Sequence, residues 1–479
     1  MILGILGFFA PATFVDQTQA LGLSLGGEQA CWVDIDQDGW PDLCASGTVW
    51  RNNAGKSFTR LADVGLVVAA DYDNDGFSDL FSYSLQKLYR NNAGKSFTEI
   101  LIPGLPPTLS RGACWADLNG DRFVDLYIGG YEDWDRDITY PSINLLNEEG
   151  KGFRVVRNTA QFRTRGVTAC DFNRSGVASV YVSNYRLQPN QLISYSRGSF
   201  SDIASVFNVV ATSTGFDGGH SIGACWGDFD NDGEIDLFAG NFAHVDSRGD
   251  QPKSRFLRNL GKTGAYHFAD LGTCGVFYQE SYASPAAADF DNDGKLDLFF
   301  TTVYGTASFN KPNFPVLFRN QGQFKFEDLT SAVRLDRLAP TYQAAWADFN
   351  RDGYPDLVTA GRLFVNQGRG NHWLEVSLSG DGKRVNRSAI GAQVRLRYRT
   401  KTDGKWHEHI LTRQVEAGTG EGNQNDLVMH FGLGDYQGKV DVEVSWPDRS
   451  VRTYRRVRLD QLIQIDRSRG VVKPVGRKS

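Results

Sequence analysis

The sequence predicts an all-β protein, in which a seven-bladed β-propeller is followed by a small antiparallel β domain. Two observations indicate the propeller. A nine-residue acidic loop recurs seven times, and a second phrase, Arg-Asn-x-x-Gly or Arg-Asn-x-Gly, follows several of these loops. A third observation indicates the second domain, because near residue 370 the acidic loops stop and runs of alternating apolar and polar residues begin.

The acidic loop is clearest from Asp71 to Asp79, where carboxylates stand at loop positions 1, 3, 5 and 9. Four carboxylates this close repel one another unless a cation lies among them. Gly76 at position 6 permits the positive φ that folds the chain back around such an ion. Oxygen ligands of this kind favour calcium, and we expect position 7 to add a backbone carbonyl.

Six copies of the loop are intact, and each offers four side-chain ligands and one carbonyl. The expected ligands are Asp34, Asp36, Asp38, Trp40 and Asp42; Asp71, Asp73, Asp75, Phe77 and Asp79; Asp117, Asn119, Asp121, Phe123 and Asp125; Asp228, Asp230, Asp232, Glu234 and Asp236; Asp289, Asp291, Asp293, Lys295 and Asp297; and Asp348, Asn350, Asp352, Tyr354 and Asp356. The copy from Asp171 to Ser179 lacks two carboxylates. We therefore expect about six structural calcium ions and one empty loop.

A single loop of this kind can equally be a surface turn with side-chain hydrogen bonds, but six copies in a repeat disfavour that interpretation. No copy has the Glu at position 12 that an EF-hand requires. Arg122 stands where the other loops have Gly, a departure that counts against metal binding by the third loop.

Each acidic loop lies between two short apolar runs, which predicts a hairpin, and the Arg-Asn phrase predicts a second hairpin. Loop starts are separated by 37, 46, 54, 57, 61 and 59 residues, so each repeat has room for one four-stranded sheet. An open solenoid is the alternative. The last repeat lacks its return strand, and the phrase from Phe14 to Thr18 matches the return strand from Phe326 to Thr330. We expect this N-terminal strand to complete blade seven.

The predicted organisation has four parts. Residues 1–12 are an apolar, signal-like segment, residues 13–370 form the propeller with its closing strand at 13–18, residues 371–466 form the second domain, and residues 467–479 are a basic tail that we expect to be disordered. Cys31, Cys114 and Cys225 share one repeat position, where we expect buried apolar side chains. Cys31 and Cys44 flank one loop and can be read as a disulfide pair.

These motifs resemble known families. The repeats are similar to the calcium-binding FG-GAP or VCBS repeats of integrin-α-like propellers. The C-terminal part resembles the ASPIC/UnbV domain, through Asn386 to Ala392, Gln424 to Asp426, His430 to Gly434 and Trp446-Pro447. Together they look like the bacterial relatives of cartilage acidic protein. The resemblance implies a secreted, calcium-stabilised propeller that serves binding or adhesion. The stretch from Glu416 to Gly422 is more polar than is usual in that family.

A candidate pocket is expected at the channel mouth opposite the acidic loops, where side chains six to eight residues outside the loops converge. These are Arg111, Tyr131, Glu132, Tyr185, His220, His244, Tyr282, Tyr304, Tyr342 and Arg362. The alternative is an ordinary polar loop surface. Apart from this pocket, the sequence contains no recognisable catalytic motif. His430 is interpreted as structural, and His407 and His409 as at most a weak metal pair.

The leading functional hypothesis is a secreted, periplasmic or extracellular module that binds a protein or a glycan. The alternative is an enzyme that acts on a small aromatic or anionic substrate in the mouth pocket, because the scaffold resembles calcium-binding propellers that catalyse Friedel–Crafts alkylation. Enzymatic activity is left open. We expect no nucleic-acid partner, and no segment after the first dozen residues is apolar enough to span a bilayer.

Overall fold

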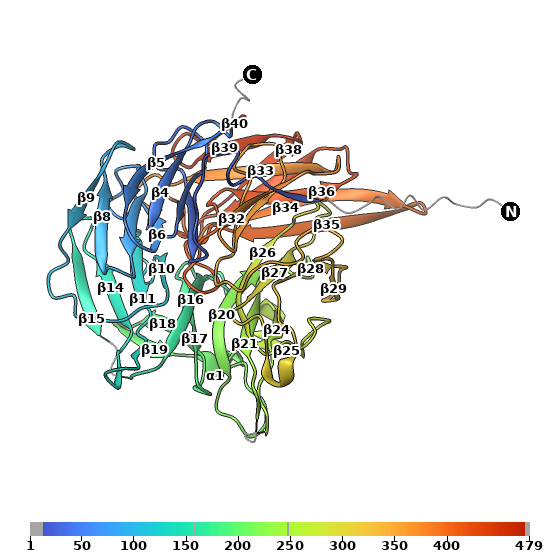
Figure 1. Cartoon of the computed structure of the whole chain (residues 1–479). Coiled ribbons are helices and arrows are strands. Elements are labelled where there is room, and N and C mark those ends of the chain that lie inside the picture. The colour runs from blue at the N-terminus through green and yellow to red at the C-terminus, as the bar shows by residue number, and fades with distance from the viewer. Residues whose placement is uncertain (1–12, 158–159, 247–248, 475–479) are drawn as a thin grey trace.

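The computed structural model describes residues 13–157, 160–246 and 249–474, so the signal-like segment lies outside the described residues. The chain is almost entirely β structure (Figure 1). Among the described residues, no helix reaches the length and hydrophobicity that a membrane crossing requires.

Seven four-stranded sheets form the first part of the chain, and each is a run of antiparallel pairs. In order from the inner strand outward they are β2 (Ala30–Val33), β3 (Asp42–Ala45), β4 (Thr48–Asn52) and β5 (Phe58–Asp63); β6 (Val67–Ala70), β7 (Asp79–Ser82), β8 (Lys87–Asn91) and β9 (Phe97–Ile100); β10 (Ala113–Ala116), β11 (Asp125–Ile128), β14 (Ile143–Asn147) and β15 (Phe153–Arg157); β16 (Thr164–Cys170), β17 (Ser179–Asn184), β18 (Gln191–Ser196) and β19 (Ser199–Asp202); β20 (His220–Gly227), β21 (Asp236–Phe242), β24 (Arg255–Asn259) and β25 (Phe268–Gly272); β26 (Tyr282–Ala288), β27 (Asp297–Thr302), β28 (Val316–Asn320) and β29 (Phe326–Asp328); and β30 (Ala345–Ala347), β31 (Asp356–Thr359), β32 (Arg362–Asn366) and β1 (Phe14–Asp16).

The sheets close into a ring, because each inner strand contacts the next and β30 contacts β2. The expected propeller-like fold is therefore confirmed, and no open edge remains between the first and last sheets. β1 pairs antiparallel with β32, with Phe14 opposite Asn366, so a strand from the start of the chain completes the last sheet. Apolar side chains fill the space between neighbouring sheets, as in the cluster that joins Trp32 of β2 to Phe349 near β30.

The loops of the ring contain short secondary-structure elements. They are the two-stranded pairs β12 (Glu132–Asp133) with β13 (Ile138–Thr139) and β22 (Val245–Asp246) with β23 (Gly249–Asp250), the single-turn helix α1 (Ala204–Phe207), and the 3₁₀ turns η1 (Lys262–Gly264) and η2 (Ser308–Asn310).

The C-terminal domain contains two four-stranded sheets. They are β36 (Met429–Gly434), β33 (His372–Ser379), β39 (Leu462–Asp466) and β40 (Val471–Pro474), and β35 (Lys405–Gln414), β34 (Gln393–Thr402), β37 (Val440–Ser445) and β38 (Val451–Val457). Two expectations need correction. β33 pairs with β39 in parallel, so the domain is not wholly antiparallel. Part of the predicted disordered tail is ordered, because β40 pairs with β39 and thereby gains ladder hydrogen bonds.

The six cysteines are free thiols. Cys31, Cys114 and Cys225 are buried, as predicted for a small apolar position. Cys31 and Cys44 lie opposite each other in the register of β2 and β3, but they form no disulfide, so that interpretation was wrong.

Candidate metal centres and the channel mouth

Each acidic loop connects the inner strand of a sheet to its second strand, and all seven lie on one face of the ring. We number them loop 1 (34–42), loop 2 (71–79), loop 3 (117–125), loop 4 (171–179), loop 5 (228–236), loop 6 (289–297) and loop 7 (348–356). In every loop the residues at positions 4 and 6 have positive φ. Arg122 therefore adopts φ 84 at a position where Gly stands in the other six loops.

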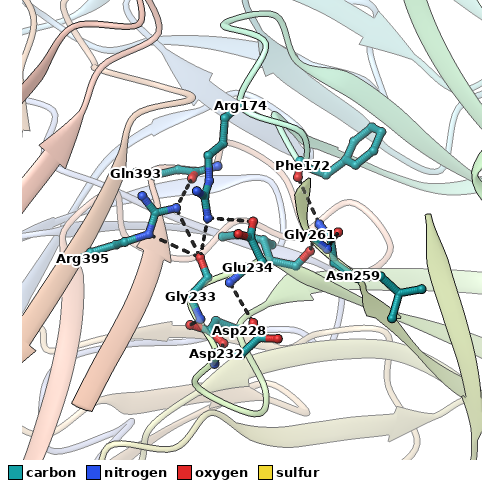
Figure 2. Close-up of polar contacts among 12 residues, drawn as sticks. Phe172, Arg174, Asp228, Asp232, Gly233, Glu234, Asn259, Gly261, Gln393 and Arg395 are labelled. Atoms are coloured by element: carbon teal, nitrogen blue, oxygen red, sulfur yellow. Dashed lines mark hydrogen bonds and ion pairs between the residues drawn. The ribbon is translucent and has the colours of Figure 1, made fainter. Parts of the chain in front are cut away.

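The Asp at position 9 holds each intact loop closed. In loop 5, Asp236 accepts hydrogen bonds from the backbone N–H of Phe229 at 3.0 Å and of Asn259 at 2.8 Å. Asn259, from the Arg-Asn phrase, donates from its side chain to the carbonyl of Phe172 in the preceding sheet (Figure 2). One sequence phrase thus positions a loop ligand and also joins two sheets.

Four loops bring three carboxylates together in the described part of the chain. The carboxylate oxygens lie within 4.8 Å of one another in the groups Asp34, Asp36 and Asp42; Asp71, Asp73 and Asp79; Asp228, Asp230 and Asp232; and Asp289, Asp291 and Asp297. These groups can hold a metal ion. Loops 3 and 7 have Asn at position 3, and Asn119 and Asn350 each donate to the Asp at position 5.

The electrostatics of these loops fit a bound cation. Burial above all, with a smaller effect of neighbouring carboxylates, raises the pKa of Asp34 to about 7 and that of Asp42 to about 8. Within the described residues, Asp34 Oδ1, Asp36 Oδ1 and Asp291 Oδ1 are buried oxygens without a hydrogen-bond partner. Buried, unpaired carboxylate oxygens are unfavourable, and a divalent cation removes that cost.

The position-7 residues have a second role. The backbone N–H of each donates to the Asp at position 5, at 2.9 to 3.0 Å, and this arrangement holds for Trp40, Phe77, Phe123, Glu234, Lys295 and Tyr354. Metal ligation by their carbonyls stays a prediction.

Side chains at loop position 4 link neighbouring loops, a contact that the sequence analysis missed. The ring has seven pairs of neighbouring loops. In five of them, all among the residues that the structure describes, the position-4 side chain of one loop donates a hydrogen bond to the position-6 carbonyl of the next loop. The pairs are Gln37 to Gly76, Arg174 to Gly233, Asn231 to Gly294, Asn292 to Gly353, and Arg351 to Gly39. The recurrence of side chains that can donate a hydrogen bond, Gln, Asn or Arg, at position 4 is the sequence feature that could have predicted these contacts.

At the two remaining steps, from loop 2 to loop 3 and from loop 3 to loop 4, the C-terminal domain sits on the metal-loop face and contacts loops 2 and 3. Asn74 of loop 2 accepts a hydrogen bond from the backbone N–H of Arg387 at 2.8 Å. Arg122 of loop 3 donates to the carbonyl of Lys383, also at 2.8 Å. Position 4 of loop 3 is Gly120, which has no side chain to donate. The C-terminal domain thus contacts the loops where the chain of position-4 contacts is interrupted.

Loop 4 keeps the shape of an acidic loop without its full set of carboxylates. Ser175 Oγ donates to Asp171 at 3.1 Å, and the N–H of Gly176 donates to the same carboxylate at 2.7 Å. Arg174 reaches loop 5, where it donates to the Gly233 carbonyl at 2.9 Å and pairs with Glu234 at 2.6 Å (Figure 2). Arg395 of the C-terminal domain contacts the same carbonyl at 3.2 Å.

A loop of the C-terminal domain, residues 415–426, fills the central channel of the ring. It exchanges hydrogen bonds of 2.9 to 3.1 Å with a residue from each of the seven inner strands, namely Trp32, Ala69, Trp115, Thr168, Ala224, Ser284 and Trp346. Space around it is tight, because a Cβ on Gly420 would lie 2.2 Å from Ser284 Oγ, and Gly420 has φ 59. The polar, Gly-rich sequence is therefore needed to fit this backbone into the channel.

In the middle of the channel loop, Glu421 forms a buried ion pair with Arg165, with 2.6 Å between the two side chains. The Arg165 guanidinium lies 5.1 to 5.6 Å from the ring centres of Tyr131, Tyr185 and Tyr342. Neither charged residue was among the predicted mouth residues. Arg165 lies six residues before loop 4, as Arg111 does before loop 3, and this repeat position was the signal that could have found it.

The structure brings most of the predicted mouth residues together and separates two of them. Arg111 lies beside Tyr131, and the His220 ring lies 4.9 Å from Tyr185 and 5.1 Å from His244. Glu132 pairs with Arg163 and Arg186, and Tyr304 contacts Phe242 next to His244. Two placements differ from expectation. Tyr282 is buried in a sheet core, stacked on Phe300 at 4.2 Å, and Arg362 pairs with Asp16 at the edge of the last sheet.

His430 is structural as interpreted, because its Nε2 lies 2.6 Å from Asn292 of loop 6 and its ring stacks on Trp373. His409 bonds to Thr400 at 2.8 Å, and burial lowers its pKa.

Comparison with known proteins finds similarity in both parts of the chain. A family model described as FG-GAP-like repeat matches residues 71–128 and 289–359, and a model described as ASPIC and UnbV matches residues 382–472. Cartilage acidic protein 1 of Mus musculus is 30% identical over 71% of this chain and 51% of its own length, and that of Homo sapiens is 30% identical over 59% and 41%. The chain thus spans about half the length of the curated relatives it matches.

A crystal structure of BBS1N in complex with ARL6DN superposes with a TM-score of 0.44 at 9% identity, covering 74% of this chain and 96% of that one. This superposition is too loose to inform function.

Proposed function

For a chain that carries FG-GAP-like repeats and an ASPIC and UnbV domain and is homologous to cartilage acidic protein 1, we propose the function of a calcium-stabilised extracellular module that binds a protein or a glycan. The repeats point to a binding module, and the matched relatives share its architecture. The proposed ligand, a protein or a glycan, would contact the exposed loops and the C-terminal surface, which the ring holds rigidly.

Calcium is the proposed metal, with about six ions in loops 1, 2, 3, 5, 6 and 7. All the side chains at positions 1, 3, 5 and 9 offer oxygen, and oxygen-rich sites with several carboxylates suit calcium better than softer metals. A bound ion neutralises carboxylates that otherwise repel, so its role is to stabilise the loops. An extracellular location of the protein favours calcium occupancy of the loops, because weak calcium sites are filled where the calcium concentration is high.

The observation that carries the proposal is the channel loop. Residues 415–426 bond to all seven inner strands, so the propeller and the C-terminal domain form one body around an occupied channel. The C-terminal domain contacts the metal-loop face, as at Asp289, whose carboxylate accepts the N–H of Gly432 at 3.0 Å. Surfaces for a partner are therefore the mouth-side loops and the outer face of the C-terminal domain.

The same loop disfavours the enzyme alternative. Glu421 already balances the charge of Arg165, and both side chains are buried, with 0% and 7% of their surface exposed. A guanidinium that binds an anionic substrate must have no carboxylate partner and must be reachable by the substrate, and Arg165 meets neither condition in this arrangement.

The test is a binding screen of the calcium-loaded chain against glycan arrays and purified extracellular proteins, run in parallel with a chelated sample. We expect saturable binding to at least one partner that is lost after chelation. Turnover of small phenolic or anionic substrates, abolished by Arg165→Gln, would instead favour an enzyme. Absence of any saturable ligand would contradict the binding module.

A further inference from the structure

The outer halves of β34 and β35 form a two-stranded ribbon that projects from the body of the protein (Figure 1). β37 pairs with β34 only as far as Arg397, and in the described residues the ribbon beyond that point pairs only with itself. Residues 401–408 are all exposed. A bare ribbon of this length is marginally stable and costs solubility, so its sequence deserves a functional explanation.

One face of the ribbon carries a row of cations beside an exposed indole. Because side chains alternate along a strand, Arg397, Arg399 and Lys401 share a face. The residues directly opposite them on β35 are Ile410, Glu408 and Trp406. Trp406 is 66% exposed, and Lys401 Nζ lies 5.8 Å from its ring centre.

The projecting ribbon has three cations and one acid, Glu408, on this face, which we call the ribbon face, and two further acids, Asp441 and Glu443 of β37, lie at its base beside Arg397. The closest carboxylate oxygens lie 3.7 Å from Arg397, on Glu443, and 4.0 Å from Arg399, on Glu408. Exposed pairs at such distances are weak and readily exchange partners. Among the described residues, Lys401 has no carboxylate within 4.0 Å. Beyond its base, the face therefore has a surplus of positive charge, although the whole chain has a formal net charge of -5.

The opposite face of the ribbon is already partnered near the body of the protein. Tyr398 stacks on His409 with ring centres 4.7 Å apart, and its other neighbour is Tyr436 at 4.6 Å. His409 also bonds to Thr400 at 2.8 Å. At the tip, Thr402, Lys405 and His407 on that face are exposed, but they form no row of cations beside an aromatic ring.

The chemistry of the ribbon face selects a linear polyanion with apolar ring faces. Alternate residues on a strand stand about 6.6 Å apart, so the three cations form a straight, evenly spaced row. A stable protein interface needs an apolar core over roughly 1,200 Å² or more, and this face offers one indole and a partly buried Ile410. An exposed indole suits the flat C–H face of a sugar ring, as it suits other apolar groups.

We propose that the ribbon face binds an acidic polysaccharide, with its carboxylate or sulfate groups on Arg397, Arg399 and Lys401 and a sugar ring on Trp406. This deepens the proposed function, on which it rests, by naming one of its two ligand classes and the surface that binds it.

The test uses the calcium-loaded full chain and four probes in calorimetric titrations, namely polygalacturonate, heparin, neutral dextran and a single-stranded thymidine oligonucleotide. The first two distinguish carboxylate from sulfate as the recognised group. We expect at least one of them to bind, with affinity that falls as salt is raised, and no binding of dextran. Binding of the oligonucleotide as tight as that of the glycans would overturn the proposal, because it would show a nucleic-acid or unselective polyanion site.

Matched variants locate the site. Arg399→Gln with Lys401→Gln removes two charges from the ribbon face, and Lys56→Gln with Lys95→Gln removes two from exposed turns of the propeller. We expect the first pair to weaken glycan binding about tenfold or more and the second to leave it unchanged. Trp406→Ala should weaken it similarly, whereas Trp134→Ala, at 67% exposure on the propeller, should not. Circular dichroism confirms that each variant is folded.

Equal binding by the ribbon variants and their controls would overturn the assignment to the ribbon while leaving a glycan-binding module intact. Failure of both acidic glycans to bind the wild type would also overturn it, and a protein ligand found in the screen would then still support the proposed function.

Discussion

Loops 4 and 5 have the same backbone shape, but different groups surround their buried carboxylates. Both begin with a buried Asp, and both have positive φ at positions 4 and 6. Loop 5 collects Asp228, Asp230 and Asp232 around a space suited to a cation. Loop 4 instead uses the Ser175 hydroxyl and contacts from its neighbours. A loop of this shape needs its buried carboxylates satisfied; loop 4 does so with protein groups, and the ion proposed for loop 5 would do so there.

The C-terminal domain also packs differently against loop 4 and against loops 5 to 7. Gln393 donates to the Asp171 carbonyl at 2.9 Å, and Arg449 donates to the Ser175 carbonyl at 2.6 Å, so loop 4 is held by direct contacts. On the side of loops 5 to 7, the same domain leaves a cavity of about 110 Å³ lined by Arg413 and Glu416. Loop 4, which lacks two carboxylates, is therefore packed directly against the C-terminal domain, whereas loops 5 to 7 border a cavity in addition to their direct contacts with that domain.

Removal of metal should give the largest effect, and it should separate the two loops. Each site filled at about a thousand times its Kd contributes on the order of 4 kcal/mol, so chelation with EGTA should lower the melting temperature by more than about 10 °C. Limited proteolysis should then cut loops 1, 5 and 6 before loop 4. An unchanged melting curve would contradict the structural role of the ions, with magnesium-supplemented buffer as the control.

Conversion of loop 5 toward loop 4 should come next. Asp236→Ser leaves the N–H groups of Phe229 and Asn259 with a weaker acceptor and removes one ligand. We expect a loss of about 3 kcal/mol in denaturant unfolding with calcium, and about one ion fewer per chain by elemental analysis. Ser179→Ala, at the corresponding position of loop 4, is the control and should cost less than about 1 kcal/mol.

The reverse conversion should create a site. Ser175→Asp with Ser179→Asp gives loop 4 the ligand pattern of loop 7, including Asn at position 3 and Arg at position 4. We expect about one additional calcium ion per chain, with the variant roughly 2 kcal/mol less stable than the wild type without metal, because the added carboxylates repel. An unchanged ion count would mean that Arg174 or the C-terminal domain blocks the loop.

The cavity beside loops 5 to 7 should make stability depend on pH. Burial raises the pKa of Glu416 from an ordinary 4.5 to about 8. The folded state therefore holds this proton more tightly than the unfolded chain, and its contribution, present below pH 4.5, is lost as pH rises toward 8. Glu416→Gln should remove that loss and raise stability at pH 8 by roughly 2 kcal/mol, with little change at pH 4.5. Unfolding measured at both pH values checks this, and equal effects at the two would contradict it.

The smallest effect should come from the link between the two loops. Arg174→Ala removes the hydrogen bond to Gly233 and the partly exposed pair with Glu234, which together contribute about 1 kcal/mol. Arg174→Lys should restore part of it. Because no ion is involved in these contacts, the loss should be the same in calcium and in EGTA, and a loss seen only in calcium would show that Arg174 acts through the metal of loop 5.

Much of the fold and part of the candidate site could be predicted from the sequence. The loops, the hairpins and the closing strand at Phe14 follow from residues that repeat at regular positions, and each loop is specified within nine residues. Tyr282 was misplaced because spacing from the loop does not reveal on which side of a strand a tyrosine packs. The parallel pairing of β33 with β39 was missed because alternation does not specify strand direction.

The sequence by itself determined the repeated loops with their carboxylates, the positive-φ turns and the resemblance of each domain to a known family, since all of these depend on residues close together in the chain. Only the tertiary structure decided that the C-terminal domain covers the metal-loop face, that residues 415–426 occupy the channel, and that Glu421 meets Arg165. Those two side chains are 256 residues apart in sequence. Contacts of that range depend on how whole domains pack, because the free energy of burying and pairing charges is set by the complete surroundings.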